Sequence, residues 1–319
     1  MLRSFFIFLS KVTWMQRLIT NWKFAWQAAS RFVAGSSIQE AIPIVRDLNN
    51  RGFDVTLDHL GESTTTTEEA IRATDQILEL LDAIDAAAIR ANVSVKLTQI
   101  GLSLDQELCQ SNLEKILLRA RQYHNFVRID MEDSPYTDET LRIYRGMRAK
   151  GHDNTGVVIQ AYLYRSEADA KALLEDGTRI RLVKGAYKEP AAIAFPKKSD
   201  VDANYDKLAN IMIGCRTMGA DSPVGVDGRF PPVPAIATHD AIRIANVKAE
   251  LAQQHLPNGT VEFQMLYGIR RDLQEQCIRE GYPVRIYVPY GTHWYAYYMR
   301  RLAERPANVW FFLSNYFRK

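Results

Sequence analysis

Short apolar segments recur along the chain from about residue 53, and segments with a helical spacing of apolar residues separate them. Eight of the apolar segments have the length and composition of buried strands. These strands are Phe53–Asp58, Val93–Leu97, Phe126–Met131, Val157–Tyr162, Arg179–Lys184, Pro234–His239, Val261–Leu266 and Val284–Val288. The helical segments are Glu68–Arg90, Leu104–Tyr123, Asp138–Lys150, Arg165–Glu175, Val201–Met218, Asp240–Gln254, Ile269–Glu280 and His293–Glu304.

Eight strand–helix units in one chain predict an α/β fold, a TIM-like (β/α)8 barrel. A doubly wound open sheet is the structural alternative. That fold would favour a phosphate-binding G-x-G-x-x-G motif or a P-loop, and the sequence contains neither. The small residues Gly35, Ser36 and Ser37 mark a joint, so we assign residues 1–38 to a basic amphipathic helical arm and residues 39–319 to the barrel.

The first residues of the chain have an unusual charge pattern. No acidic residue precedes Glu40, and three of the five tryptophans (Trp14, Trp22, Trp26) lie here among basic residues. The apolar run Phe5–Leu9 is far shorter than the roughly 20 residues that a membrane-spanning helix needs. Three interpretations stay open: an amphipathic helix on an anionic membrane surface, helices packed on the barrel, or a transit peptide.

Composition narrows the function class. A net charge of +3 over 319 residues is too small to indicate nucleic-acid binding. The three cysteines (Cys109, Cys215, Cys277) lie far apart, which argues against a disulfide framework or a zinc site, and the six histidines show no metal-binding spacing. These features favour a cytoplasmic protein without a metal site, and the arm adds peripheral contact with the inner face of the cytoplasmic membrane as a further expectation.

Polar side chains gather where the predicted strands end. In a barrel of this type the active site lies at the carboxyl ends of the strands, so these residues are candidates for a common site. One or two could be core polar groups with satisfied hydrogen bonds, but so many together indicate a site. The candidates are Lys96, Asp130 with Glu132, Gln160, Arg181 with Lys184, Thr238 with His239, Glu262 with Gln264, and Tyr287, joined by Glu62 in an early loop.

A strand, a turn and a helix between Val284 and Glu304 carry two adjacent arginines. Arg300 and Arg301 follow an apolar strand and a turn at Pro289 and Gly291. Two guanidinium groups offer rigid forks of N–H donors that suit a small carboxylate. The alternative is a solvated pair that complements the negative end of the helix dipole.

The order of the motifs RLVKGAY (from Arg181), EFQMLYG (from Glu262) and YVPYGTHWYAYYMRRL (from Tyr287) closely resembles the flavin-dependent proline dehydrogenase family. The resemblance extends from about Phe53 to Phe312 and is closest to the stand-alone bacterial type. It implies a distorted (β/α)8 barrel and a flavoenzyme that oxidises L-proline to Δ1-pyrroline-5-carboxylate, reduces FAD and passes the electrons to membrane quinone. One departure is Lys188, where many members carry an aromatic residue.

The resemblance also implies roles for the residues of the substrate pocket. Arg300 and Arg301 match residues that pair with the proline carboxylate, and Lys96 lies nearby. Tyr287 packs on the substrate ring, which predicts a preference for proline over 4-hydroxyproline. Leu182 and Tyr187 complete the pocket.

Asp130 and Arg181 match residues considered catalytic, and Glu62 matches an acid that forms a gate with Arg300. The expected FAD contacts are Met131, Gln160, Val183, Lys184, Gly185, Ala186, Thr238 and His239. These roles agree with the chemistry, because Arg181 can stabilise the negative charge that a flavin gains on reduction. An arginine-rich pocket also favours loss of the ammonium proton of proline.

Two other functions stay open on the sequence. A lyase on the same barrel could use a metal held by Asp130 and Glu132, or a Schiff base on Lys96 or Lys184. A non-catalytic barrel could bind amino acids as a membrane-associated sensor. Bound flavin, visible as a yellow colour, distinguishes proline dehydrogenase from both, and its bleaching by proline separates enzyme from sensor.

Overall fold

The structure is a computed structural model that describes residues 26, 29–61, 64–215 and 227–304. Eight parallel strands form a closed barrel in sequence order, and β1 and β8 pair to complete it. The predicted (β/α)8 fold is therefore confirmed. The strands are β1 (Asp54–His59), β2 (Ala91–Val95), β3 (Val127–Ile129), β4 (Thr155–Gln160), β5 (Ile180–Val183), β6 (Pro234–Ala237), β7 (Glu262–Leu266) and β8 (Val284–Tyr290).

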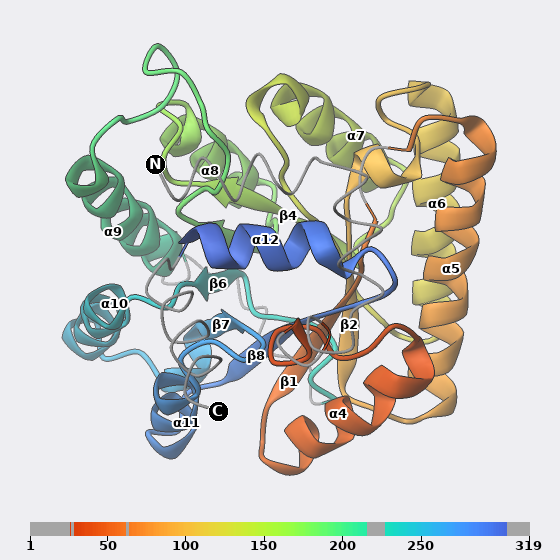
Figure 1. The fold of residues 1–319 in the computed structure, drawn as a ribbon. Helices are drawn as coiled ribbons and strands as arrows, with labels where there is room; N and C mark the ends of the chain where they lie inside the picture. Colours follow the sequence, from red (N-terminus) through yellow and green to blue (C-terminus); the bar gives the residue numbers. More distant parts are fainter. Residues whose placement is uncertain (1–25, 27–28, 62–63, 216–226, 305–319) are drawn as a thin grey trace, which may run out of the picture.

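Helices cover the outside of the barrel, and their ends lie within a few residues of the predicted ones (Figure 1). Side-chain caps fix several starts: Thr66 accepts a hydrogen bond from the Glu69 amide, and Asp105 accepts one from the Leu108 amide. The outer helices that follow strands are α5 (Thr67–Ala86), α6 (Gln106–Gln122), α7 (Thr137–Ala149), α8 (Ser166–Glu175), α9 (Lys198–Gly214), α10 (Ala241–Gln253) and α11 (Arg271–Arg279).

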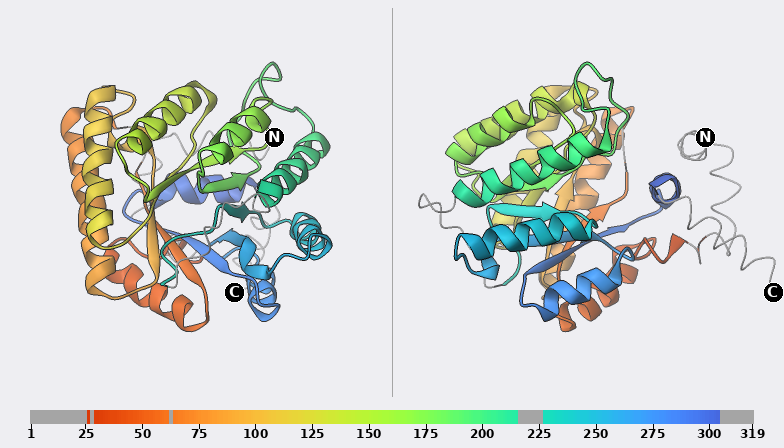
Figure 2. Two further views of the ribbon diagram at one scale, coloured as in Figure 1. Left: turned by 180° about the vertical axis from the view of Figure 1, so that it is seen from behind. Right: turned by 90° about the vertical axis from the view of Figure 1, so that its left-hand side faces the viewer.

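The helix after β8 departs from this pattern. α12 (Trp294–Glu304) lies across the carboxyl ends of the strands, and the right-hand view of Figure 2 shows it end-on beyond the barrel. Its place in the outer ring, between α11 and α5, is taken by α4 (Ile38–Asn50), which contacts β1 and α5 (Figure 1). This exchange distorts the barrel and leaves α12 free to cover one end of it.

The sequence pattern does not predict α4 as a separate element. Ser37 caps the helix by accepting a hydrogen bond from the Glu40 amide, and Ala41, Val45 and Leu48 form its buried stripe. Pro43 lies inside the helix and obscures the helical pattern in the sequence. Most of the arm assigned to residues 1–38 lies outside the described residues.

The interior of the barrel is polar, in contrast with the branched aliphatic side chains that usually fill such barrels. Side chains alternate along a strand, so Val55 and Leu57 of β1 pack in the core shared with the helices. Thr56, between them, donates a hydrogen bond to Asn92 on β2 at 2.6 Å. The same alternation fills the interior with Asp58, Ser94, Arg128, Arg181, Glu262, Gln264 and Arg285, all buried.

Among the described helices, none is both long and apolar enough to cross a lipid bilayer.

Candidate active site

A cavity of about 660 Å³ opens at the carboxyl ends of the strands, below α12. All but four of the residues predicted for the site line it. They are Lys96, Asp130, Met131, Gln160, Arg181, Val183, Lys184, Gly185, Ala186, Tyr187, Thr238, His239, Gln264, Tyr287, Arg300 and Arg301. The strands place these side chains together because consecutive parallel strands end at the same rim.

Asp130 and Arg181 form an ion pair in the wall of this cavity. Arg181 Nη1 lies 2.7 Å from Asp130 Oδ1, and Ser94 Oγ lies within hydrogen-bond distance of both side chains. The other carboxylate oxygen accepts a hydrogen bond from the Tyr287 hydroxyl at 2.7 Å. Burial, together with the negative charge of Asp130, raises the pKa of Tyr287 well above its usual value, so the phenol stays protonated and donates.

Lys96 lies between two carboxylates. Its Nζ is 3.3 Å from both oxygens of Asp58 and 3.9 Å from Asp130 Oδ2. Asp58 is buried and also lines the cavity, although it is not among the site residues predicted from the sequence. The sequence feature that could have identified Asp58 is its position at the end of an apolar strand segment, where the alternation of side chains turns it into the barrel. The two acids hold the ammonium group at the cavity wall.

Lys184 is held by two carboxylates on the opposite side of the mouth. Its Nζ pairs with Asp202 of α9 and with Asp240 at 2.8 Å. Burial alone would raise the pKa of Asp202, but hydrogen bonds from Lys184 and Lys198 hold it below its usual value. Burial would likewise raise the pKa of Asp240, but the hydrogen bond from Lys184 holds that pKa below its usual value. Both acids were missed because their partners lie far away in the sequence.

α12 brings the arginine pair to the cavity. Arg300 and Arg301 are half-buried and line it, so they do not form the solvated pair considered as the alternative. The Arg301 guanidinium lies 5.1 Å from the centre of the Tyr297 ring, which also lines the cavity. Two guanidinium groups, a lysine and a tyrosine therefore converge on one space.

Glu62 and Leu182 are not part of this arrangement. Glu62 lies outside the described residues, so its gate with Arg300 stays a prediction. Leu182 does not line the cavity: its side chain is fully buried in the core shared with the helices. The correction follows from strand alternation, which turns Leu182 away from the interior that Arg181 and Val183 face.

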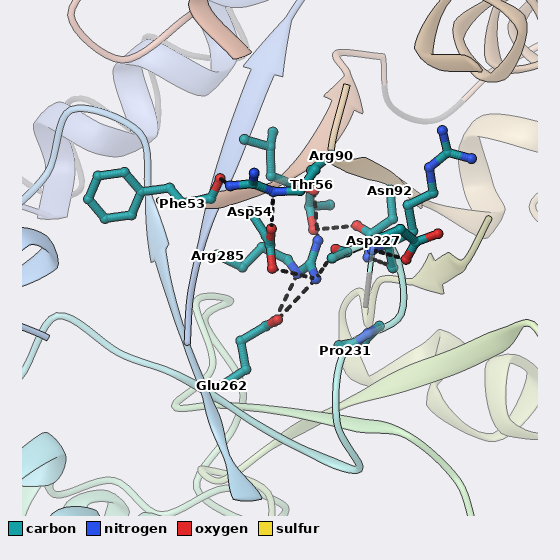
Figure 3. Close-up of polar contacts among 12 residues, drawn as sticks. Phe53, Asp54, Thr56, Arg90, Asn92, Asp227, Pro231, Glu262 and Arg285 are labelled. Atoms are coloured by element: carbon teal, nitrogen blue, oxygen red, sulfur yellow. Dashed lines mark hydrogen bonds and ion pairs between the residues drawn. The ribbon is translucent and has the colours of Figure 1, made fainter. Parts of the chain in front are cut away.

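The prediction that Glu262 lies at the mouth of the barrel with the other site residues is wrong. It is the first residue of β7, at the opposite end of the barrel, and its carboxylate pairs with Arg285 at 2.8 Å (Figure 3). Glu132 does not face a common site with Asp130 either. It accepts hydrogen bonds from the amide and hydroxyl of Thr98. The described residues contain no group of three or more acidic, histidine or cysteine side chains that could hold a metal ion.

Comparison with known proteins agrees with this geometry. The sequence profile of the proline dehydrogenase family matches residues 41–313. The chain belongs to the proline dehydrogenase family. It is 41% identical over 310 residues to proline dehydrogenase 2 of Bacillus subtilis, covering 97% of this chain and 96% of that one. It is 40% identical over 292 residues to proline dehydrogenase of Deinococcus radiodurans, covering 90% and 89%.

The structure is also similar to proline utilization A from Bdellovibrio bacteriovorus inactivated by N-propargylglycine. The TM-score is 0.78 at 25% sequence identity, and the match covers 87% of this chain and 32% of that longer chain. The family assignment made from the sequence is thus confirmed, and the protein is an oxidoreductase. Its coverage of the Bacillus and Deinococcus enzymes matches the stand-alone type.

Proposed function

We propose that this enzyme oxidises L-proline to Δ1-pyrroline-5-carboxylate with FAD as the electron acceptor. One observation supports this proposal above the others: Arg181 and Asp130 from the strands and Arg300 and Arg301 from α12 line a single cavity. Its volume of about 660 Å³ is in the range of sites for cofactors and small ligands. FAD, when bound, would supply the two-electron acceptor that the oxidation of a C–N bond requires.

The residues at the cavity suit a flavin. Gln160 Oε1 is buried and has no hydrogen-bond partner among the described residues, and an N–H group of a flavin ring would satisfy it. Gly185 and Ala186 add little or no side-chain volume to the cavity wall beside β5. A Cβ at Gly185, where φ is +109°, would come within 2.4 Å of the Tyr162 ring, so only glycine fits this turn. We assign the cofactor contacts to Met131, Gln160, Val183, Lys184, Gly185, Ala186, Thr238 and His239.

The substrate carboxylate would bind Arg300 and Arg301, with Lys96 adjacent. Anchoring the carboxylate fixes the position of the proline ring, so the carbon to be oxidised is held in one place. Five lysine and arginine side chains line the cavity against three aspartates, and this excess of positive charge disfavours the ammonium form of proline and promotes its deprotonation. Arg181, fixed by Asp130, would stabilise the negative charge that develops on the acceptor.

Anaerobic addition of L-proline to the purified protein tests this function. The protein should be yellow, and its flavin absorbance should bleach with proline but not with glycine, which lacks the ring. A double Arg300→Met/Arg301→Met variant should stay yellow and need at least tenfold more proline for half-maximal reduction, because the carboxylate loses its charge-assisted hydrogen bonds. A colourless protein, or a yellow one that proline does not bleach, would contradict the proposal.

We further propose that the electrons pass to membrane quinone and that residues 1 to about 35 contribute to membrane contact. Support comes from the sequence alone, from basic residues and tryptophans without any acidic residue before Glu40. Deleting residues 1–25, which leaves Ala29, Phe32 and Val33 packed against α12, should weaken binding to vesicles that contain anionic lipid. If the shortened protein binds the vesicles as well as the full chain does, this part of the proposal fails and the proline chemistry is unaffected.

A further inference from the structure

A chain of hydrogen bonds runs inside the barrel from its amino-terminal end to the cavity. Arg285 donates to both carboxylate oxygens of Glu262, at 2.8 and 3.0 Å. The same carboxylate accepts a hydrogen bond from Gln264 Nε2 at 2.6 Å, and Gln264 Oε1 accepts one from Arg181 Nε at 2.6 Å. None of the four side chains is more than 6% exposed.

The two neighbours of Gln264 determine which way its amide faces. Arg181 can only donate hydrogen bonds, and a carboxylate such as that of Glu262, which pairs with Arg285, can only accept them. If the amide turned over, its NH2 group would face the Arg181 N–H and its oxygen would face the Glu262 carboxylate. Both hydrogen bonds would be lost in a buried place where water cannot replace them. Only one amide orientation is compatible with these neighbours.

This orientation matters because it fixes the guanidinium of Arg181. The group is planar and is held at two points, Nε by Gln264 Oε1 and Nη1 by Asp130 Oδ1. Two fixed N–H directions define the plane and therefore the direction of Nη2. Asp130 and Ser94 both bind Nη1, so without Gln264 the guanidinium would be held through that single nitrogen.

We propose that Gln264 is a positioning residue of the active site, which sets the plane of the Arg181 guanidinium and is itself oriented by the Glu262–Arg285 pair. The inference rests on the proposed function for its consequence in catalysis. It gives the ion pair at the far end of the barrel a role in the reaction, although that pair does not line the cavity.

Replacement of Gln264 by Met tests the first half of the proposal. The flexible apolar side chain fills similar space and removes the acceptor for Arg181 Nε. In anaerobic single-turnover experiments, the limiting rate of flavin reduction should fall by at least tenfold. The apparent Kd of proline should change by less than threefold, because other residues bind the carboxylate. Equal changes in both quantities, or an unchanged rate, would overturn the role of Gln264.

Gln274→Met is the matched control. Gln274 is 3% exposed, and its amide donates only to the backbone oxygens of Leu266 and Ile269. The same substitution there removes buried hydrogen bonds of comparable number but does not touch Arg181. Its limiting rate should stay within twofold of the unmodified protein, at a temperature at which both variants remain folded.

Replacement of Gln264 by Glu tests the second half of the proposal, namely that Glu262 orients the side chain at position 264. A protonated carboxyl group has the same pattern as the amide: its O–H can donate to Glu262 and its C=O can accept from Arg181. The ionised form places two carboxylates against each other and breaks the chain. Other charged groups lie one contact away: Asp130 and Arg285 pair with Arg181 and Glu262, and Arg128 interacts electrostatically with Arg181, Glu262 and Asp130. The variant should therefore recover at low pH.

Between pH 9 and pH 6, the ratio of the variant's reduction rate to that of the unmodified protein should rise at least fivefold. The gap between their thermal unfolding midpoints should narrow over the same range, because protonation stabilises the pair only in the folded chain. A ratio and a gap that do not depend on pH would overturn the orienting role of Glu262. If proline does not reduce the unmodified protein, the proposed function fails, and the unfolding midpoints still test the hydrogen-bond chain.

Discussion

Two ionic clusters occupy the two ends of the barrel interior. The floor cluster consists of Asp54, Arg90, Glu262 and Arg285, at the end where the strands begin (Figure 3). The mouth cluster consists of Asp58, Lys96, Asp130 and Arg181, at the end where the strands finish. Each contains a buried arginine–carboxylate pair, and the two closest contacts measure 2.8 and 2.7 Å.

The clusters differ in what surrounds them. At the floor, Arg285 also donates to the backbone oxygens of Val55 and Gly228, and backbone packs directly on the cluster. A Cβ on Gly228, where φ is +67°, would come within 2.2 Å of the Asp54 carboxylate. At the mouth, the pair borders a cavity of about 660 Å³. A buried ion pair alone therefore does not mark an active site. What distinguishes the mouth cluster from the floor cluster is the open cavity beside it.

The largest expected effect is the loss of stability that follows from breaking the Arg285–Glu262 pair of the floor cluster. Arg285→Met leaves the buried carboxylate of Glu262 without its partner, and such a change costs about 3–5 kcal/mol. Urea unfolding should show this loss. Adding Glu262→Leu should restore a large part of the stability, since apolar side chains can replace both charges. A loss below about 1 kcal/mol for the single variant would mean that the floor cluster is not structural.

At the mouth, the corresponding change should affect the reaction more than the fold. Arg181→Met should lower the rate of flavin reduction by proline about 10²–10³-fold, the usual effect of removing one preorganised donor. Asp130 keeps Lys96 and Tyr287 as partners, so the loss of stability should be smaller than for Arg285→Met.

The control is Arg179→Met, on the same chain segment but nearer the floor. The Arg179 side chain donates to the backbone oxygen of Pro231 and stacks near Phe230, away from the cavity. Arg179→Met should lower the stability of the protein and leave the rate of flavin reduction within about threefold of that of the unmodified protein. The comparison of the two ends fails if Arg181→Met destabilises the protein as much as Arg285→Met while keeping most of its activity.

The sequence predicted the barrel and most of the cavity wall because both depend on local patterns. Parallel strands place their ends on one rim, so residues such as Lys96, Gln160 and Thr238 could be grouped without knowing their contacts. Leu182 shows the limit of that reasoning. It follows Arg181 in a specific motif, but strand alternation turns it into the outer core.

Contacts between distant strands were beyond the sequence pattern. Glu262 was placed at the mouth because it precedes Gln264 in an apolar segment, yet β7 begins at Glu262 and that end of the strand lies at the floor. The partners of Lys184 and Lys96 lie 56 and 38 residues away, and no local rule joins them. A helix that replaces another in the outer ring, as α4 does, is likewise a property of the closed barrel.

A smaller effect should appear in substrate choice when Tyr287 becomes Ser. The Tyr287 side chain lines the cavity. If it packs on the substrate ring, as the family resemblance implies, it would hinder a hydroxyl on that ring. Replacing it should narrow the preference for proline over 4-hydroxyproline by about tenfold, the usual scale for a change of pocket size. The measurement is the ratio of kcat/KM values, and Tyr290→Ser on the same strand serves as a control outside the cavity wall. An unchanged ratio would count against the role assigned to Tyr287.

The smallest expected effect is the pH dependence of the stability that Asp54 contributes to the floor cluster. The pKa shift of Asp54 predicts its direction. Burial raises the pKa of Asp54 above its usual value of 3.8, even though Arg285 and Arg90 oppose the shift. A raised pKa in the folded state means that the carboxyl group favours folding most below the unfolded-state pKa, and that this contribution is lost as the pH rises through the folded-state pKa. The destabilisation caused by Asp54→Asn should therefore be larger near pH 4 than at pH 7 in urea unfolding. If it grows with pH instead, the two arginines outweigh burial. The floor cluster would then hold its carboxylates by charge pairing, as the mouth cluster does, and the two ends would differ only in the open cavity.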